Sequence, residues 1–254
     1  MADSFDLIEE KIIKSKLRVQ KHGEVFTPQS IVKKMLDVPG IREACESLTT
    51  TFLEPAAGEG AFLIAILRRK LKMVANIYSD DLVKYENYSL LALSTLYGIE
   101  LLEDNAQTCV INMFQVYYEF YQEQAVKYEG KMKHKVLDSA KVIISNNIAQ
   151  GNFLTRLSAS GTPIIFSEWT PIKLDKKTKH IRVERTEYTL DEIFGGKEKS
   201  FGEAAAENVK DEQLSIFDYI NEIEETLQKE RKSMKYVLVK ISDVYKEEME
   251  EVDG

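Results

Sequence analysis

The most constraining feature of this chain is the stretch Phe52–Leu63, which reads FLEPAAGEGAFL. A short apolar run ends in an acid, a Gly-x-Gly turn follows, and apolar residues then resume, which is the pattern of a strand, a tight loop and a helix. Gly58 and Gly60 allow positive φ angles and let a ligand approach the backbone without meeting a Cβ atom. Glu54 falls at the strand end, where open parallel sheets bind their ligands.

The composition of this turn limits what the ligand is. The turn lacks the third glycine of the dinucleotide fingerprint, and it has no Gly-Lys-Ser/Thr of a phosphate loop. Glu54 would also repel a phosphate. The turn therefore favours a cationic ligand that carries an amino acid, and S-adenosylmethionine is one. Taken alone, the segment is equally consistent with an ordinary short connection between a strand and a helix.

Three further segments carry similar signals. Upstream, Phe26-Thr27-Pro28 precedes a helical pattern that runs through Leu36. Downstream, the segment 96–101 reads as a short strand that ends in Glu100, and a helix start follows it. A third strand end is expected at 147–154. Strand signals that alternate with helix signals predict a parallel sheet with helices on both faces.

The order and spacing of these four segments resemble the N-terminal half of DNA adenine-N6 methyltransferases, most closely the modification subunits of type I restriction-modification systems. The resemblance covers roughly residues 20 to 155, and its most specific elements are Phe26-Thr27-Pro28 and the Glu-Pro-Ala-x-Gly-x-Gly run that starts at Glu54. It implies an α/β fold of the class I S-adenosylmethionine-dependent methyltransferases, a Rossmann-like parallel sheet flanked by helices. The fold is expected to be incomplete, with a C-terminal appendage.

The resemblance also implies the roles of individual residues. Glu100 would accept hydrogen bonds from the ribose hydroxyls of the cofactor, since a carboxylate takes two donors at once. Glu54 would lie near the methionine ammonium, Thr27 would bind the methionine end, and Phe153 would stack on the purine. The whole expected cofactor set is Phe26, Thr27, Pro28, Glu54, Ala56, Ala57, Gly58, Gly60, Phe62, Glu100, Leu101, Asn152 and Phe153. For Phe26-Thr27-Pro28 the plainer interpretation is a helix N-terminus with proline in its first turn, and the two are compatible.

The chain departs from the family in two places. At the third strand end, the family usually has aspartate to accept from the adenine amine, and Asn152 stands here instead, with a neutral amide oxygen. The Asn-Pro-Pro-aromatic motif that binds the flipped target base is absent, because no two prolines are adjacent. The nearest substitute is Ser167-Glu168-Trp169, a weak catalytic candidate. A plain edge strand or hairpin that continues into residues 181–185 is the interpretation we favour.

Composition adds limits. The chain has 254 residues and a formal net charge of −8, which is awkward for a protein that binds DNA by itself. Basic clusters occur at 11–21 and 68–72, and we favour solvated helix faces over DNA contacts for the first. The two cysteines and three scattered histidines predict neither disulfides nor a metal site. With neither a leader nor a membrane-spanning run in the sequence, we expect a cytoplasmic protein.

We expect three regions: an N-terminal helical region over 1–48 with a helix at about 4–19, a cofactor-binding α/β domain over 49–194, and a linker with a docking or capping segment over 195–254. The resulting hypothesis is a split methyltransferase. This chain would bind S-adenosylmethionine, and a second subunit would supply the catalytic motif and the recognition of double-stranded DNA. The alternatives are a non-catalytic cofactor-binding or scaffold protein, and a methyltransferase for a protein or small molecule that acts through residues 167–171.

Overall fold

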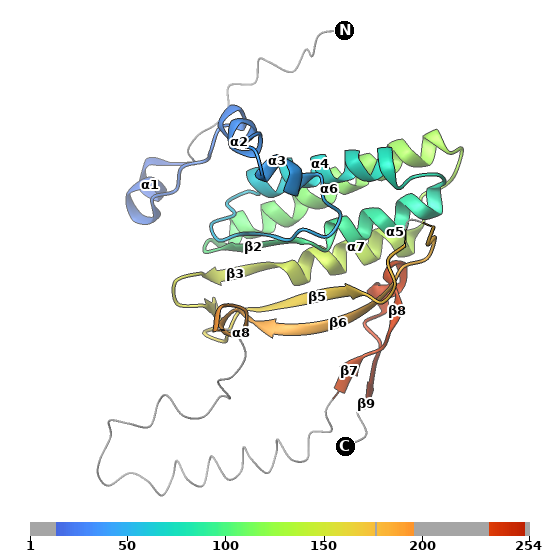
Figure 1. Cartoon of the computed structure of the whole chain (residues 1–254). Coiled ribbons are helices and arrows are strands. Elements are labelled where there is room, and N and C mark those ends of the chain that lie inside the picture. The colour runs from blue at the N-terminus through green and yellow to red at the C-terminus, as the bar shows by residue number, and fades with distance from the viewer. Residues whose placement is uncertain (1–13, 176, 196–233, 252–254) are drawn as a thin grey trace, which may run out of the picture.

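The computed structural model describes residues 14–175, 177–195 and 234–251. The expected helix at about 4–19 lies partly outside these ranges, and within them the first helix starts at Lys16, after Ser15 takes an extended conformation as its N-cap. The composition also predicts a linker at 195–200 and an apolar helix at about 211–234. Both lie outside the described residues except for Gly195, which ends a helix, and Met234, which starts a strand. The helices are α1 (Lys16–His22), α2 (Gln29–Leu36), α3 (Ile41–Cys45), α4 (Ala61–Ile77), α5 (Leu82–Leu93), α6 (Glu103–Lys127), α7 (His134–Asn147) and α8 (Leu190–Gly195) (Figure 1).

The central sheet has the strand order β1-β2-β3-β4. Strands β1 (Phe52–Glu54), β2 (Leu96–Glu100) and β3 (Ile148–Asn152) are parallel, and the short β4 (Leu157–Ser158) is antiparallel to β3. The three parallel strands confirm the α/β class and the strand positions that the strand-end acids and glycines predict. The β-branched threonines at 49–51 predict an earlier strand start, but β1 begins at Phe52. In the turn before it, the Nζ atom of Lys70 donates to the carbonyls of Ser47 and Thr50 at 2.6 and 2.9 Å.

A second sheet has the order β5-β6-β8. Strands β5 (Ile165–Pro171) and β6 (Arg182–Thr189) form the antiparallel hairpin that the alternating sequence predicts. Beyond it, β8 (Val239–Lys240) pairs with β6, while β7 (Met234–Tyr236) and β9 (Met249–Glu251) form a separate pair. The apolar and β-branched residues at 236–241 predict one continuous strand, and this prediction is wrong, because residues 237 and 238 belong to neither β7 nor β8. The chain leaves extended geometry at Ile241 and enters a 3-10 helix, Ile241–Lys246, which buries Ile241 in the core.

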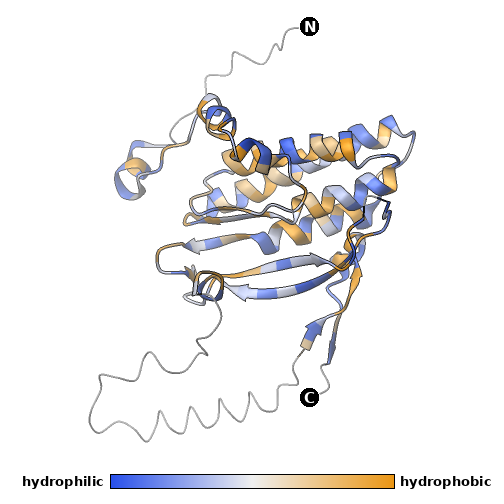
Figure 2. Cartoon of the chain, in the orientation of Figure 1, coloured by the Kyte–Doolittle hydropathy of each residue, from blue (hydrophilic) through white to orange (hydrophobic). Residues whose placement is uncertain are grey.

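The two faces of the central sheet are covered differently. Leu96 and Ile148 face the main core, together with the buried residues of α4, α5, α6 and α7. Figure 2 shows the hydrophobic positions that run through these helices. On the opposite face, Ile99 packs with Phe166 of β5 and Leu190 of α8 in a second, smaller core. Helices on both faces are expected from the alternation of elements. Among the described residues, α4 and α6 cover one face and the hairpin with the short α8 covers the other, while α7 leads directly into the start of β3 (Figure 1).

Candidate functional site

The glycine loop between β1 and α4 has the backbone that its sequence predicts. Gly58 and Gly60 take φ angles of 55° and 93°, in the left-handed region that residues with a Cβ rarely adopt. A Cβ atom at Gly60 would also lie 2.9 Å from the Sγ atom of Cys109 on α6. Gly60 is therefore required twice, by its backbone conformation and by the close approach of α6.

The strand-end acid of β2 meets this loop. Glu100 is 8% exposed, and its Oε2 atom accepts a hydrogen bond of 2.7 Å from the amide of Gly58. Its Oε1 atom accepts from the amide of Leu102 at 2.9 Å and from the Asn105 side chain at 3.5 Å. A carboxylate offers about four lone-pair positions, so Oε2 retains capacity for a further donor. The structure thus brings together two residues that are far apart in the sequence and that were both predicted to bind the cofactor.

This contact is possible because β2 lets the loop come close. Gly98 lies in β2 opposite Glu54, and a Cβ atom there would be 2.8 Å from Leu63 and 3.3 Å from Ala57. The glycine therefore makes room for the buried Ala57 of the loop and for the first turn of α4. The carboxyl ends of β1 and β2 then lie side by side, as parallel pairing requires.

Glu54 ends β1 as a half-buried carboxylate. Its Oε1 atom accepts a hydrogen bond of 3.3 Å from the amide of Ala56. Burial raises the pKa of Glu54 above its usual value, because water is withdrawn from the charged form and the single bond compensates only in part. Within the described residues, no cation forms a salt bridge with it. A positively charged group placed here would therefore gain from an undercompensated negative charge.

The Phe-Thr-Pro segment lies against the same loop. The Phe26 ring is 3.7 Å from the position that a Cβ of Gly58 would take. Thr27 is half-buried beside it, and Pro28 is the N-cap residue of α2. The segment starts a helix, with Pro28 at the N-cap and not in the first turn, and it also contacts the glycine loop; its contact with a cofactor stays a prediction.

The third strand end differs from the expectation in one respect. The Oδ1 atom of Asn152, predicted to accept from the adenine amine, accepts instead from the amides of Leu154 and Thr155 at 2.9 and 3.4 Å in a local turn. The Phe153 ring packs edge-to-face on Phe194, with centroids 5.7 Å apart. The strand end lies at the expected edge of the sheet, but the acceptor is already in use.

The remaining predicted residues occupy different environments. Ala56 and Leu101 are exposed at the strand ends, and Phe62 packs against the main core from the first turn of α4. The weak catalytic candidates divide between the two faces of the hairpin. Ser167 and Trp169 are 2% and 4% exposed, and they bind Arg185 and Asn147 respectively, whereas Glu168 is exposed. Their burial fits a structural hairpin better than a site that must admit a substrate.

A charged network that sequence reasoning missed borders the site. Lys14, Arg18 and Glu24 precede the Phe-Thr-Pro segment and bind Asp104 and Asn105, two residues in the first turn of α6. Asn105 is 1% exposed, and it donates to Glu24 at 2.7 Å as well as contacting Glu100. One local signal was present in the sequence, an acid two residues before Phe26 with Arg18 six residues earlier, but Asn105 is 81 residues away.

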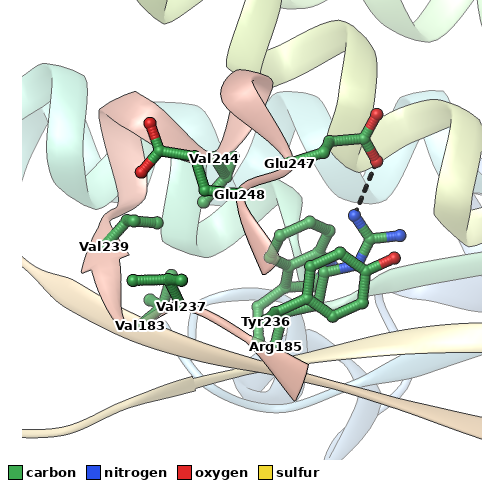
Figure 3. A pocket seen from close by; sticks show the side chains of 9 residues that line it. Val183, Arg185, Tyr236, Val237, Val239, Val244, Glu247 and Glu248 are labelled. Carbon is green, nitrogen blue, oxygen red and sulfur yellow. Dashed lines mark hydrogen bonds and ion pairs between the residues drawn. The ribbon is translucent and has the colours of Figure 1, made fainter. Parts of the chain in front are cut away.

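Two hollows in the described residues lie away from the glycine loop. One, of about 10 Å³, surrounds Arg185 (Figure 3). The guanidinium carbon of Arg185 lies 5.0 Å from the ring centroid of Trp169 and 4.0 Å from that of Tyr236. Its guanidinium donates to Glu247 at 2.7 Å, so the group is satisfied within the protein. The other is an open groove beside Asp81, Tyr128 and Lys179. Neither arrangement has the strand-end acids and glycines of the loop site.

Comparisons with known proteins returned no matching family model, curated protein or solved structure. Among the described residues, no helix combines the length and apolar character needed to cross a membrane. In the same residues, no group of histidine, cysteine and acidic side chains is arranged to hold a metal ion. The case for a function therefore depends on the loop site itself.

Proposed function

We propose that this chain is the S-adenosylmethionine-binding subunit of a split DNA adenine-N6 methyltransferase from a restriction-modification system. The observation that carries the proposal is the meeting of three separate segments: Phe26 lies on Gly58, and Gly58 donates to Glu100. These are the segments whose order in the sequence resembles the methyltransferase family. The polarity of the site supports the same ligand class, since both strand-end acids border one glycine loop.

The residues fit the cofactor at its two polar ends. Glu100 would accept from the ribose hydroxyls through the capacity that remains on Oε2, and Glu54 would pair with the ammonium of the methionine moiety. That pairing would offset the desolvation that raises the pKa of Glu54. Phe26 would shield the methionine end from solvent. When bound, the cofactor supplies the methyl group; the residues of this chain bind it, orient it and exclude water, and positioning accounts for most of the rate.

The open edge of the central sheet supports a partner subunit. Within the described residues β1 pairs only with β2, so its other side has no strand. The amide of Phe52 donates to Thr95 at 2.9 Å, and because neighbouring residues of a strand point in opposite directions, Leu53 directs its amide and carbonyl to the unpaired side. Phe52 and Leu53 are each only half-buried. A parallel strand from a partner would complete both the hydrogen bonds and the packing.

The charges of the chain also support a partner subunit that binds the DNA. The basic cluster on α4 is largely occupied, because Arg69 pairs with Asp37 at 2.6 Å, Arg68 lies 3.6 Å from Glu119, and Lys70 is buried. A chain with a net charge of −8 and such neutralised clusters is poorly suited to bind DNA unaided. The partner would then carry the basic surface as well as the Asn-Pro-Pro-aromatic motif, which the sequence of this chain lacks.

Titration calorimetry with S-adenosylmethionine and with its demethylated product tests the cofactor site. We expect one site per chain, at least about tenfold weaker binding in Glu100→Ala, and unchanged binding in Glu103→Ala, which removes an exposed acid at the start of α6. Absence of binding by the native chain, alone and with its partner, would overturn the proposal. Methyl transfer to adenine in DNA should require the product of a neighbouring gene, and robust transfer by this chain alone would disprove the split.

One observation favours a second function. The amide oxygen of Asn152 accepts hydrogen bonds within a local turn, so it is a weaker acceptor for the adenine end of the cofactor than the aspartate of the family. A non-catalytic protein that senses the cofactor, or that acts as a scaffold, would tolerate this. Cofactor binding without methyl transfer in any reconstituted mixture would support this alternative.

A further inference from the structure

Residues 14–26, which we call the strap, pass from α1 to the glycine loop. Gly23 ends α1 with a φ of 65° and turns the chain so that Phe26 reaches Gly58. In Figure 1, α1 lies at the end of the sheet toward which β3 points, which is the end where the strand-end acids lie. The strap therefore borders the strand ends at which the proposed cofactor would bind.

Arg18 is the centre of the strap's contacts. Its guanidinium binds both oxygens of Glu24, within the strap, through Nε and through Nη2 at 2.8 Å. It also binds both oxygens of Asp104 on α6, at 2.9 and 3.0 Å. Such two-point contacts between a guanidinium and a carboxylate are directional as well as strong. Arg18 thus joins the strap to the first turn of α6.

Lys14 joins the strap to the glycine loop. Its Nζ atom lies 2.8 Å from Glu59, in the glycine loop, and 3.0 Å from Asp104. Glu24 adds a third connection through its 2.7 Å bond from Asn105, the residue that also contacts Glu100. The strap is therefore tied to both sides of the loop site, and each tie involves a charged group.

Apolar burial contributes little to holding α1 and the segment after it. Leu17 and Val25 are 58% and 57% exposed and Val19 is half-buried, so none of these three apolar side chains is buried in the core. Exposed ion pairs contribute modestly to stability and weaken in salt, and segments with few buried contacts open locally at low cost. Charge pairs, more than a hydrophobic core, thus set the equilibrium between a closed and an open strap.

We propose that the strap is a charge-latched cover of the loop site and that Arg18 is a positioning residue that keeps it closed. A ligand reaches and leaves the strand ends beside Gly58 and Glu100 when the Arg18 contacts with Asp104 break, and closure returns Phe26 to the glycine loop. The proposal rests on the proposed function for the identity of the ligand. The opening itself is a property of the protein and is measured without one.

Hydrogen exchange on the full chain measures the opening directly. We expect the amides of α1 to exchange about tenfold faster in Arg18→Gln than in the native chain, since the paired hydrogen bonds from the guanidinium to Asp104 are lost. Lys21→Gln is the matched control, because it removes the same charge from an exposed position on the same helix. Added salt should speed exchange in the native chain, and by a smaller factor in Arg18→Gln, where only the Lys14 and Glu24 contacts remain. Equal exchange in Arg18→Gln and the native chain would overturn the latch.

Stopped-flow binding of S-adenosylmethionine tests the cover. In Arg18→Gln the association and dissociation rate constants should both rise, by at least about threefold, because entry and exit share the opening step. A structural role alone would raise only the dissociation rate constant, so an unchanged association rate constant would overturn the cover. If the native chain binds no cofactor, the proposed function fails, and the exchange experiment still decides whether Arg18 latches the strap.

Discussion

Substitution of Gly60 by alanine is the sharpest test of the loop geometry. The new Cβ atom would lie 2.9 Å from Cys109 Sγ and 3.6 Å from Cys109 Cα, and Cys109 is fully buried. Burial raises the pKa of this thiol to about 12, so it stays neutral and packs as a small apolar group. The backbone at a φ of 93° adds strain of its own.

The expected cost has two parts. The left-handed conformation costs alanine roughly 1–2 kcal/mol, and crowding in a packed core costs roughly 1–3 kcal/mol more. Gly23→Ala separates them, because Gly23 has a φ of 65° and no atom within 4 Å of the new Cβ position. That variant should lose only the backbone part. Gly60→Ala should therefore be the less stable of the two by roughly 1–3 kcal/mol.

Denaturant unfolding of the two variants and of the native chain measures this difference. Addition of Cys109→Ala to Gly60→Ala should recover part of the loss, because it removes the sulfur atom that the new methyl group meets. Cys109→Ala alone supplies the fourth corner of the cycle. Equal stability of Gly60→Ala and Gly23→Ala, or no recovery in the double variant, would refute the close approach of α6 to the loop.

Three further predictions follow from single contacts. Burial lowers the pKa of Lys70 to about 8 from 10.5, so between pH 8 and 9 the unfolded state holds more protons than the folded state. Over that pH range the free energy of unfolding of the native chain should rise by about 1 kcal/mol more than that of Lys70→Met. A flat profile would mean that the bonds from Lys70 to the carbonyls of the preceding turn keep the proton in place. Leu53→Pro removes the amide that points to the open edge of β1, so it should abolish methyl transfer by the mixture with the partner, while Leu53→Ala, which keeps the amide, should retain it. Equal activity of the two variants would exclude strand addition at this edge. Ser167→Ala should lower the free energy of unfolding by about 1 kcal/mol in thermal unfolding, because it removes the acceptor for Arg185 at 3.0 Å. It should leave methyl transfer by the reconstituted enzyme intact, and loss of transfer in a folded variant would restore Ser167 as a catalytic candidate.

Local patterns determined the elements of this protein. The strand ends at Glu54, Glu100 and Asn152 were predictable because an apolar run, a polar stop and a helix start are neighbours in the sequence. The hairpin of β5 and β6 was predictable from its alternation. The meeting of Gly58 and Glu100 also followed in outline, since parallel strands place their carboxyl ends at one edge.

Tertiary structure decided which surfaces these elements share. Nothing within α4 and α6 says that both lie on the same face of the sheet, because each apolar stripe fits either face. The contact of Gly60 with Cys109 and the ties from Arg18 to Asp104 join residues 49 and 86 positions apart, and only the folded chain brings them together. The sequence by itself specified the glycine loop and its acids; the long-range packing decided how closely α6 approaches the loop and what covers it.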